Sequence, residues 1–224
     1  MGLRELSKQL QVIAEEELNE VPSRIGADIV ALIKWIEAQP YLNARTEDQW
    51  LLSFLRVSKF SIEKAKARID KFYSLRSFAP EVFKFRDPYH SAVQAVFKER
   101  LAIILPIVNG EPVRIIFRVG TVDIDILTFE LRIKILTMIL DFLLQECDEI
   151  SIVGMCVLLD GRGVTYKHLT QVTLPAVRKC VTCFVNAYPI RIKAVHIIHV
   201  PSFAIPIINL GLHLLPKKVA SVVS

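Results

Sequence analysis

The sequence predicts an α/β fold, in which an N-terminal helical bundle is followed by a mostly parallel sheet covered by helices. Three observations predict it. Apolar residues recur at helical spacing through the first hundred residues, and from Leu101 short apolar runs alternate with long helical patterns. Hydrophobic residues make up 52% of the chain against 23% charged residues, which predicts a large buried surface. The change of pattern divides the chain into a helical module, residues 1–100, and a second unit, residues 101–224.

The helical module contains three clear helical patterns. The first follows Pro22, has apolar residues at 25, 29, 32, 33 and 36, and ends at Gln39-Pro40. Thr46 can cap a second helix that carries acidic residues in its first turn, and a third runs from about Ser61 to Ser77. We expect these helices to pack as a small bundle, with the charged stretch before Pro22 as a flexible or docked lead-in.

Strands and helices alternate in the second unit. The predicted elements are a strand at 113–119, a helix at 129–147, a strand at 150–159, a helix at 166–187, a strand at 192–200 and an apolar segment at 202–215. The run from 150 to 159 is continuously apolar, as in strands that are buried on both faces. Such alternation favours a largely parallel sheet with helical crossovers.

No segment predicts a membrane-spanning helix or an export signal. A spanning helix needs about 20 apolar residues, and the two most apolar segments are interrupted by Asp141 and by Pro206 and Asn209. The N-terminus has no apolar signal core. The chain has 4 cysteines at irregular spacing, unlike a secreted disulfide scaffold. We therefore expect a cytoplasmic protein.

Charge is distributed unevenly along the chain. The net charge is +5, and no acidic residue follows Asp160, whereas basic residues continue as far as Lys218. A one-sided basic segment favours an anionic partner, either phospholipid headgroups or nucleic acid. The interleaved aromatic residues that stack on bases are missing from this segment. The sequence therefore favours membrane lipid over nucleic acid.

The sequence gives little reason to expect catalysis, a metal or a cofactor. It contains no Gly-x-Ser-x-Gly elbow, no Gly-x-x-x-x-Gly-Lys phosphate loop and no Gly-x-Gly-x-x-Gly fingerprint. His196 and His199 are three apart on a predicted strand and so point to opposite faces, and Cys180-x-x-Cys183 has no second ligand pair nearby. We interpret Asp160 and His168, near a strand end, as turn and helix-start residues. We expect a binding protein, not an enzyme.

Three stretches together resemble the CRAL-TRIO family of lipid carriers. They are Trp50–Ala65, the strand 153–159 with Asp160-Gly-Arg-Gly and His168–Pro175, and Tyr188–Ile198 leading through Pro201 to Phe203. The resemblance implies the α/β fold predicted above. It also implies a hydrophobic ligand, of the tocopherol, retinoid, carotenoid or phospholipid class, that the protein transfers between membranes.

In such a carrier the ligand lies in an apolar pocket under a movable cover. The segment after Pro201 has almost no polar face and corresponds to the family's gate; without the resemblance the same pattern would indicate a helix buried in the core. Each pocket candidate taken alone would likewise indicate plain core. The candidate ligand-facing residues are Val157, Leu159, Val177, Val181, Phe184, Ile197, Phe203, Ile207 and Ile208.

Alternation places Arg191 and Lys193 on one face at the beginning of a strand. In the family a basic pair at these positions contacts phosphoinositide headgroups at the pocket mouth, and Lys218 is a third candidate; a solvated strand end is the alternative interpretation. The resemblance thus implies a phosphoinositide-containing membrane as partner, with transient association with endomembranes.

Family members continue past the gate into another strand and further helices, whereas this sequence ends at Ser224. We therefore expect the second unit to be incomplete at its C-terminus and the strand at 192–200 to have an unpaired edge. The alternative function is that of a truncated, membrane-associated or regulatory variant that holds no ligand.

Overall fold

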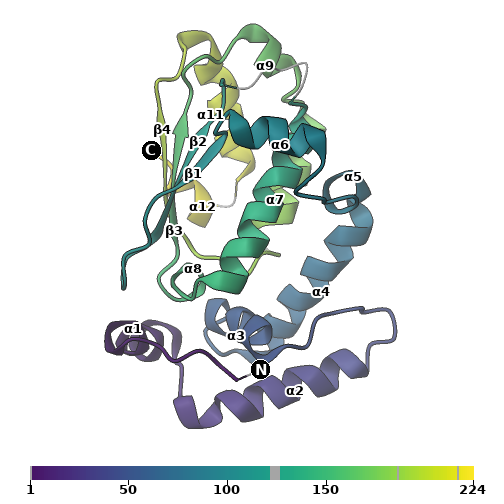
Figure 1. The fold of residues 1–224 in the computed structure, drawn as a ribbon, viewed down its shortest axis with the longest axis vertical. Helices are drawn as coiled ribbons and strands as arrows, with labels where there is room; N and C mark the ends of the chain where they lie inside the picture. The colour runs from purple at the N-terminus through teal and green to yellow at the C-terminus, as the bar shows by residue number, and fades with distance from the viewer. Residues whose placement is uncertain (1, 122–126, 186, 216) are drawn as a thin grey trace.

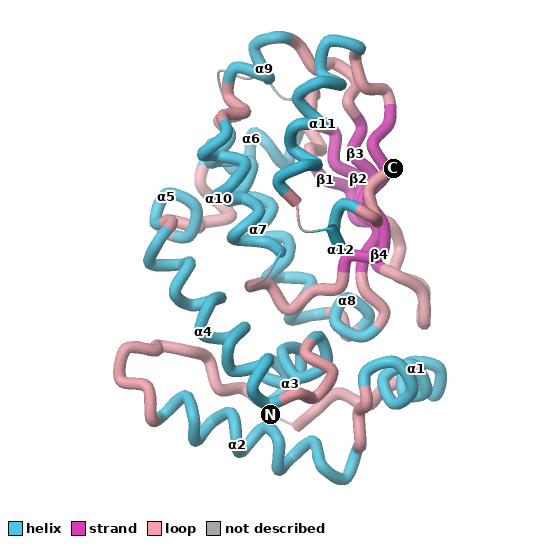
Figure 2. Tube along the Cα trace, turned by 180° about the vertical axis from the view of Figure 1, so that it is seen from behind, coloured by secondary structure: helices cyan, strands magenta, loops and turns pink. Residues whose placement is uncertain are grey.

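The protein is an α/β structure with a four-stranded sheet in the order β1-β2-β3-β4 (Figure 1). The computed structural model describes residues 2–121, 127–185, 187–215 and 217–224, and of residues 179, 180, 182–185, 218 and 219 it describes the backbone only. Helices α6, α7, α10, α11 and α12 all lie on one side of the sheet, as Figures 1 and 2 show from opposite directions. The predicted fold class is confirmed.

The regular elements of the first hundred residues are all helices. They are α1 (Lys8–Leu18), η1 (Pro22–Arg24), α2 (Ile25–Glu37), α3 (Asp48–Val57), α4 (Ile62–Phe78), α5 (Pro80–Phe83) and α6 (Ser91–Lys98). The charged lead-in is a docked helix, because α1 buries Leu10, Ala14 and Leu18 in a cluster with Ile152 and Val153.

The predicted cap of α3 is wrong by one residue. Its N-cap is Glu47, not Thr46, and the Glu47 carbonyl accepts the first helical hydrogen bond from the amide of Leu51. The N-cap is the residue whose carbonyl begins the helical ladder, so a nearby hydroxyl alone does not define it.

The second unit contains the sheet and its crossover helices. Its elements are β1 (Ala102–Ile104), β2 (Val113–Arg118), α7 (Phe129–Glu146), α8 (Glu149–Ile152), β3 (Met155–Asp160), α9 (Tyr166–Thr170), α10 (Leu174–Val185), β4 (Ile192–Ile198), η2 (Ser202–Ala204), α11 (Ile205–Leu214) and α12 (Lys217–Ala220). Strands β2, β3 and β4 are parallel, and β1 is antiparallel to β2. Helices connect the parallel strands, as crossovers between such strands usually do.

Two predicted elements have the wrong extent. The run from 150 to 159 is not one strand, since α8 ends at Ile152 and β3 begins at Met155. Between them Gly154 adopts a φ of +111°, which glycine reaches at little cost, and its amide donates to the carbonyl of Glu149. The helix predicted at 166–187 is two helices, because Pro175 has no N–H to donate to the carbonyl of Gln171, the C-cap of α9.

The prediction of an unpaired edge along β4 is wrong. Residues 222–224 run parallel to β4 and form a bridge to it between Val223 and Val195. The amide of Val195 donates to the Val222 carbonyl at 2.7 Å, and the amide of Ile197 donates to the Ser224 carbonyl at 2.8 Å. The last residues of the chain thus satisfy backbone groups that an open edge would expose.

One continuous core connects the helical module to the sheet. It contains Trp50, Phe54 and Phe72 from α3 and α4 together with Ile115 of β2 and Tyr188 before β4. The rings of Phe72 and Tyr188 meet edge to face with their centroids 5.1 Å apart, a favoured arrangement of aromatic pairs.

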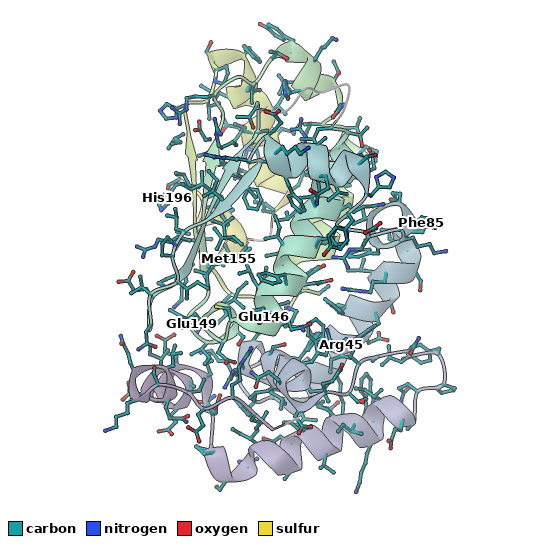
Figure 3. The ribbon with its side chains drawn as sticks, viewed as in Figure 1. Arg45, Phe85, Glu146, Glu149, Met155 and His196 are labelled. Carbon is teal, nitrogen blue, oxygen red and sulfur yellow. The ribbon has the colours of Figure 1, made fainter. Side chains whose placement is uncertain are left out.

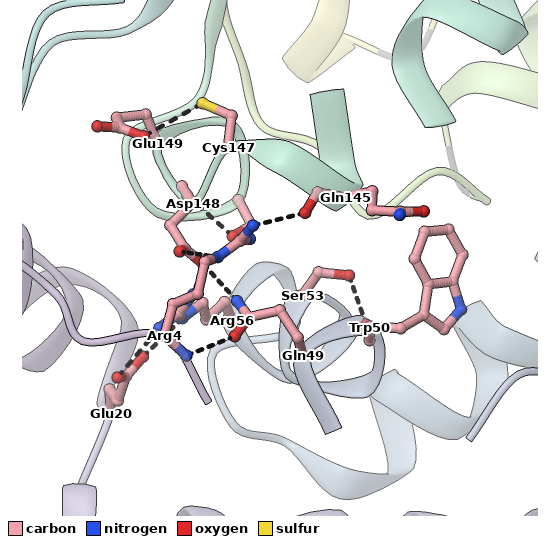
Figure 4. Close-up of polar contacts among 11 residues, drawn as sticks. Arg4, Glu20, Gln49, Trp50, Ser53, Arg56, Gln145, Cys147, Asp148 and Glu149 are labelled. Atoms are coloured by element: carbon pink, nitrogen blue, oxygen red, sulfur yellow. Dashed lines mark hydrogen bonds and ion pairs between the residues drawn. The ribbon is translucent and has the colours of Figure 1, made fainter. Parts of the chain in front are cut away.

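A buried ion network lies at the same junction (Figure 4). Arg56 of α3 is fully buried; its Nε donates to Glu20 at 2.9 Å and its Nη1 donates to Asp148 at 2.6 Å. Arg4 and Gln49 also donate to the Asp148 carboxylate, at 2.8 and 2.6 Å. Residues far apart in the sequence are therefore held together where α8 meets the N-terminal helices.

Candidate functional site

The helix-covered face of the sheet is apolar. Alternation places Met155 on this face and His196 on the other, and in Figure 3 His196 points away from the helices. Register pairs Leu159 directly with Ile197, and both are half-buried, whereas Val157 is buried in the main core. Two of the three predicted strand residues therefore adjoin near the carboxyl end of the sheet, and the third lies deeper. The prediction missed their neighbours on the same face, Ile115, Phe117 and Val195.

Helix α10 lies beside α11 on this side of the sheet. Its residues Val177 and Val181 are one turn apart and both half-buried. The side chain of the third predicted residue of α10, Phe184, lies outside the described part of the structure. The described contribution of α10 to the candidate pocket is therefore a pair of valines.

Helix α11 is apolar but has no buried residue. Ile207, Ile208 and Leu212 are half-buried and recur at helical spacing, so they form an inward side. On the outward side, Ile205 and Leu210 are 45% and 57% exposed. α11 is thus a surface helix with apolar residues on both sides, not a helix buried in the core.

Phe203, in η2 just before α11, stacks on Tyr166 at the start of α9. Their ring centroids are 4.1 Å apart and the rings are inclined by 21°. Tyr166 is 69% exposed, so this stack lies at the surface. Phe203 therefore joins the beginning of the α11 segment to α9.

Arg191 and Lys193 converge on one carboxylate at the beginning of β4. Arg191 Nη2 donates to Glu17 Oε2 of α1 at 2.8 Å, and Lys193 Nζ lies 3.5 Å from the same oxygen. Arg191 Nη1 also donates to the carbonyl of Ile152. The predicted pair is thus together in space, with an acidic partner that sequence inspection missed. The side chain of Lys218 lies outside the described residues.

Gly154 makes room for this pair. A Cβ at Gly154 would lie 2.5 Å from the carbonyl oxygen of Arg191 and 3.1 Å from Cγ of Lys193. The β3–β4 register also shifts here, so that Lys193 is an extra residue between the partners of Met155 and Cys156. Such a bulge redirects side chains locally. The absence of a side chain at Gly154 and the bulge at Lys193 together set the position of both cations.

A second apolar feature lies elsewhere, between α6, β1 and α7. It is a hollow of about 450 Å³ lined by residues including Phe97, Ile104, Met138 and Phe142. An ion pair of 2.7 Å between Arg86 and Asp141 stands in its wall. None of the predicted ligand-facing residues whose side chains the structure describes lines this hollow.

Comparison with known proteins identifies the fold family. The profile of the CRAL/TRIO domain matches residues 108–224. The chain belongs to the CRAL/TRIO domain family. A Pinta-like UBA domain profile matches residues 21–93. The resemblance drawn from the three sequence stretches is confirmed.

Two named relatives are less than 30% identical to this chain, which spans less than two thirds of their length. The mouse alpha-tocopherol transfer protein-like protein is 28% identical over 218 residues, which cover 96% of this chain and 63% of the relative. Clavesin-1 of Xenopus laevis is 22% identical over 188 residues, which cover 83% of this chain and 56% of that protein. The crystal structure of Sfh5 superposes with a TM-score of 0.53 at 12% identity, covering 99% of this chain and 81% of that one, and supports the fold alone.

The polar residues at the carboxyl end of the CRAL/TRIO sheet hold turns together. Asp160 is buried; it accepts from Arg162 Nη2 and from the Arg162 amide, and it lies 3.1 Å from His199 Nδ1. The Arg162 guanidinium in particular holds the pKa of Asp160 far below its usual range. His168 forms a capping box with Thr165 at the start of α9. These contacts agree with their interpretation as turn and helix-start residues.

The two histidines of the β4 segment face different partners. His196 Nδ1 lies 2.7 Å from Ser224 Oγ, whereas His199 faces Asp160.

Within the described residues no group of three or more His, Cys, Asp or Glu side chains could hold a metal ion. The side chains of Cys180 and Cys183 lie outside the described part. None of the helices that the structure describes is long and apolar enough to cross a bilayer.

Proposed function

We propose that this CRAL/TRIO protein holds one hydrophobic small molecule or lipid between the sheet and α11 and transfers it between membranes. The observation that carries the proposal is α11, an apolar helix without a buried residue. Exposed apolar surface costs roughly 25 cal/mol per Å² in water, so such a helix favours apolar contacts on both sides. A ligand beneath α11 and a bilayer outside it would supply them.

Family membership supports a lipophilic ligand. A tocopherol is one candidate, because the mouse relative is named for alpha-tocopherol transfer. Retinoid, carotenoid and phospholipid classes suit the same apolar lining, since side chains such as Leu159 and Ile197 provide surface without directional polar contacts. The proposed role is binding and transfer rather than catalysis.

We further propose that Arg191 and Lys193 contact phosphoinositide headgroups, with Lys218 as a third cation. The first two cations already share one anionic partner, Glu17. Two converging cations suit a multiply charged phosphate. Cytoplasmic residence with transient visits to endomembranes follows from this role.

Lipid analysis of the purified protein tests the ligand. A stoichiometric apolar molecule should be extracted from wild type and lost from Ile208→Asp, which puts a charge on the inward side of α11. Leu210→Asp on the outward side is the matched control and should retain it. Folded protein that is repeatedly free of lipid would refute carriage; if it still bound vesicles, a membrane-surface role without cargo would be favoured.

Vesicle binding tests the headgroup role. Arg191→Ala with Lys193→Ala should weaken binding to vesicles that contain phosphatidylinositol 4-phosphate by about 2 kcal/mol, since each cation near an anionic surface is worth about 1 kcal/mol. Added salt should weaken wild-type binding as well. Unchanged binding of the double variant at low salt would refute this role.

A further inference from the structure

Glu17 occupies the place where an anionic headgroup would bind. Its carboxylate accepts from Arg191 at 2.8 Å and lies 3.5 Å from Lys193 Nζ, so one oxygen is shared by both cations. The Arg191 hydrogen bond above all, and then the nearby Lys193 charge, lower the pKa of Glu17, so it is ionised at neutral pH. The cationic pair is therefore already compensated by one negative charge.

Helix α1 holds Glu17 at this position. Leu18, the next residue, is buried with Ile152 and Val153 of the segment that leads to Gly154. Ser7 caps α1 by accepting from the amide of Leu10 and also donates to Asn109. The helix is thus fixed at both ends, while the Glu17 side chain itself is exposed to solvent. A headgroup that takes the position shared by the two cations therefore displaces this carboxylate.

We propose that Glu17 sets the headgroup specificity of the Arg191–Lys193 site, selecting phosphomonoester headgroups over singly charged lipids. The inference rests on the headgroup role proposed above. A singly charged headgroup would replace one negative charge by another, so it would gain little binding free energy. A phosphomonoester carries about −1.5 to −2 charges and three strong acceptor oxygens, enough to satisfy Arg191 and Lys193 together.

The displacement is reversible because the contact is exposed. Ion pairs between solvated side chains contribute little, since water competes for both partners. The adjacent acidic residue Glu20 cannot take part, because its buried carboxylate is bound to Arg56. Glu17 thus acts as a weak resident competitor that a stronger anion overcomes.

The test compares two vesicle types of equal surface charge. Phosphatidylcholine vesicles carry either phosphatidylinositol 4-phosphate or enough phosphatidylserine to match it, and binding of wild type, Glu17→Gln and Glu16→Gln is measured. Glu16 is exposed on the same helix, so its variant removes the same charge without touching the pair. Glu17→Gln should raise phosphatidylserine binding about five-fold, the factor for ~1 kcal/mol. Binding to the phosphoinositide should rise less, so the preference falls.

The outcomes separate the two proposals. Loss of preference in Glu17→Gln but not in Glu16→Gln supports the inference. If the two glutamine variants behave alike while the Arg191→Ala, Lys193→Ala variant loses binding, the Glu17 role is overturned and the headgroup role stands. If that double variant binds as well as wild type, both are overturned. Thermal midpoints of the glutamine variants should stay close to wild type and exclude loss of α1 as the cause.

Discussion

Two of the ion clusters that join the N-terminal helices to the second unit differ in burial. In the Arg56 cluster the side chains of Arg56, Glu20 and Asp148 are 2%, 1% and 10% exposed. In the Arg191 cluster the side chains of Arg191 and Glu17 are 19% and 47% exposed, and Lys193 is 38% exposed. Both use an arginine against a glutamate from the segment around α1. Residue type alone does not distinguish them.

The difference in burial indicates which cluster is structural and which can exchange its anion. A charge left alone in the interior has no water to replace its partner, so the buried cluster must remain intact in the folded protein. In the open cluster water can take the place of either partner at little cost. Only the open cluster is therefore suited to exchange its internal anion for an external one.

The substitution with the largest expected effect breaks the buried cluster. Arg56→Met leaves Glu20 without its partner and should lower the free energy of unfolding by about 3–5 kcal/mol. Urea denaturation measures it. The Arg191→Ala, Lys193→Ala variant is the contrast and should stay within about 1 kcal/mol of wild type. Similar losses in both would show that burial is not what separates the clusters.

A smaller effect concerns the glycine beneath the open cluster. Gly154→Ala places a side chain at a φ of +111° and against the carbonyl of Arg191, so it should cost about 1–3 kcal/mol. Gly211→Ala in α11 is the control, since nothing lies within 4 Å of its Cβ position; it should stabilise by up to about 1 kcal/mol. Chemical denaturation compares them. If Gly154→Ala is neutral, the glycine is not required for this geometry.

The smallest expected effect depends on pH. It tests an intermediate case, in which the buried side chain of Asp160 pairs with Arg162. The Arg162 side chain is 68% exposed. The folded-state pKa of Asp160 is lowered, so its contribution to stability is present above the unfolded value of about 3.9 and is lost as the pH falls below it. Asp160→Asn should therefore be less stable than wild type at pH 7. The difference should shrink in acid unfolding curves below about pH 4. A pH-independent difference would contradict the ion-pair explanation.

Local patterns were sufficient to predict most elements. The helices at 25–37 and 62–78 and the strand at 113–118 lie close to their predicted positions, because amphipathic period and end signals act over a few residues. The errors at Gly154 and Pro175 also had local signals, since glycine permits the positive φ and proline interrupts the helical hydrogen bonds. The apolar side chains of the candidate pocket were predictable in the same way, from alternation and helical spacing.

By itself the sequence determined the fold class, the family motifs, the apolar character of α11 and the pairing of Arg191 with Lys193 on one face. Only the tertiary structure decided that α11 has no buried residue, that residues 222–224 pair with β4, and that Glu17 meets Arg191. The physical reason is the distance along the sequence over which the interactions act. Helical period and strand alternation are set by neighbouring residues, whereas Glu17 and Arg191 are separated by 174 positions and meet only because α1 packs on the segment before β3. Burial, which makes one arginine structural and leaves the other partly exposed, is likewise a property of the packed chain.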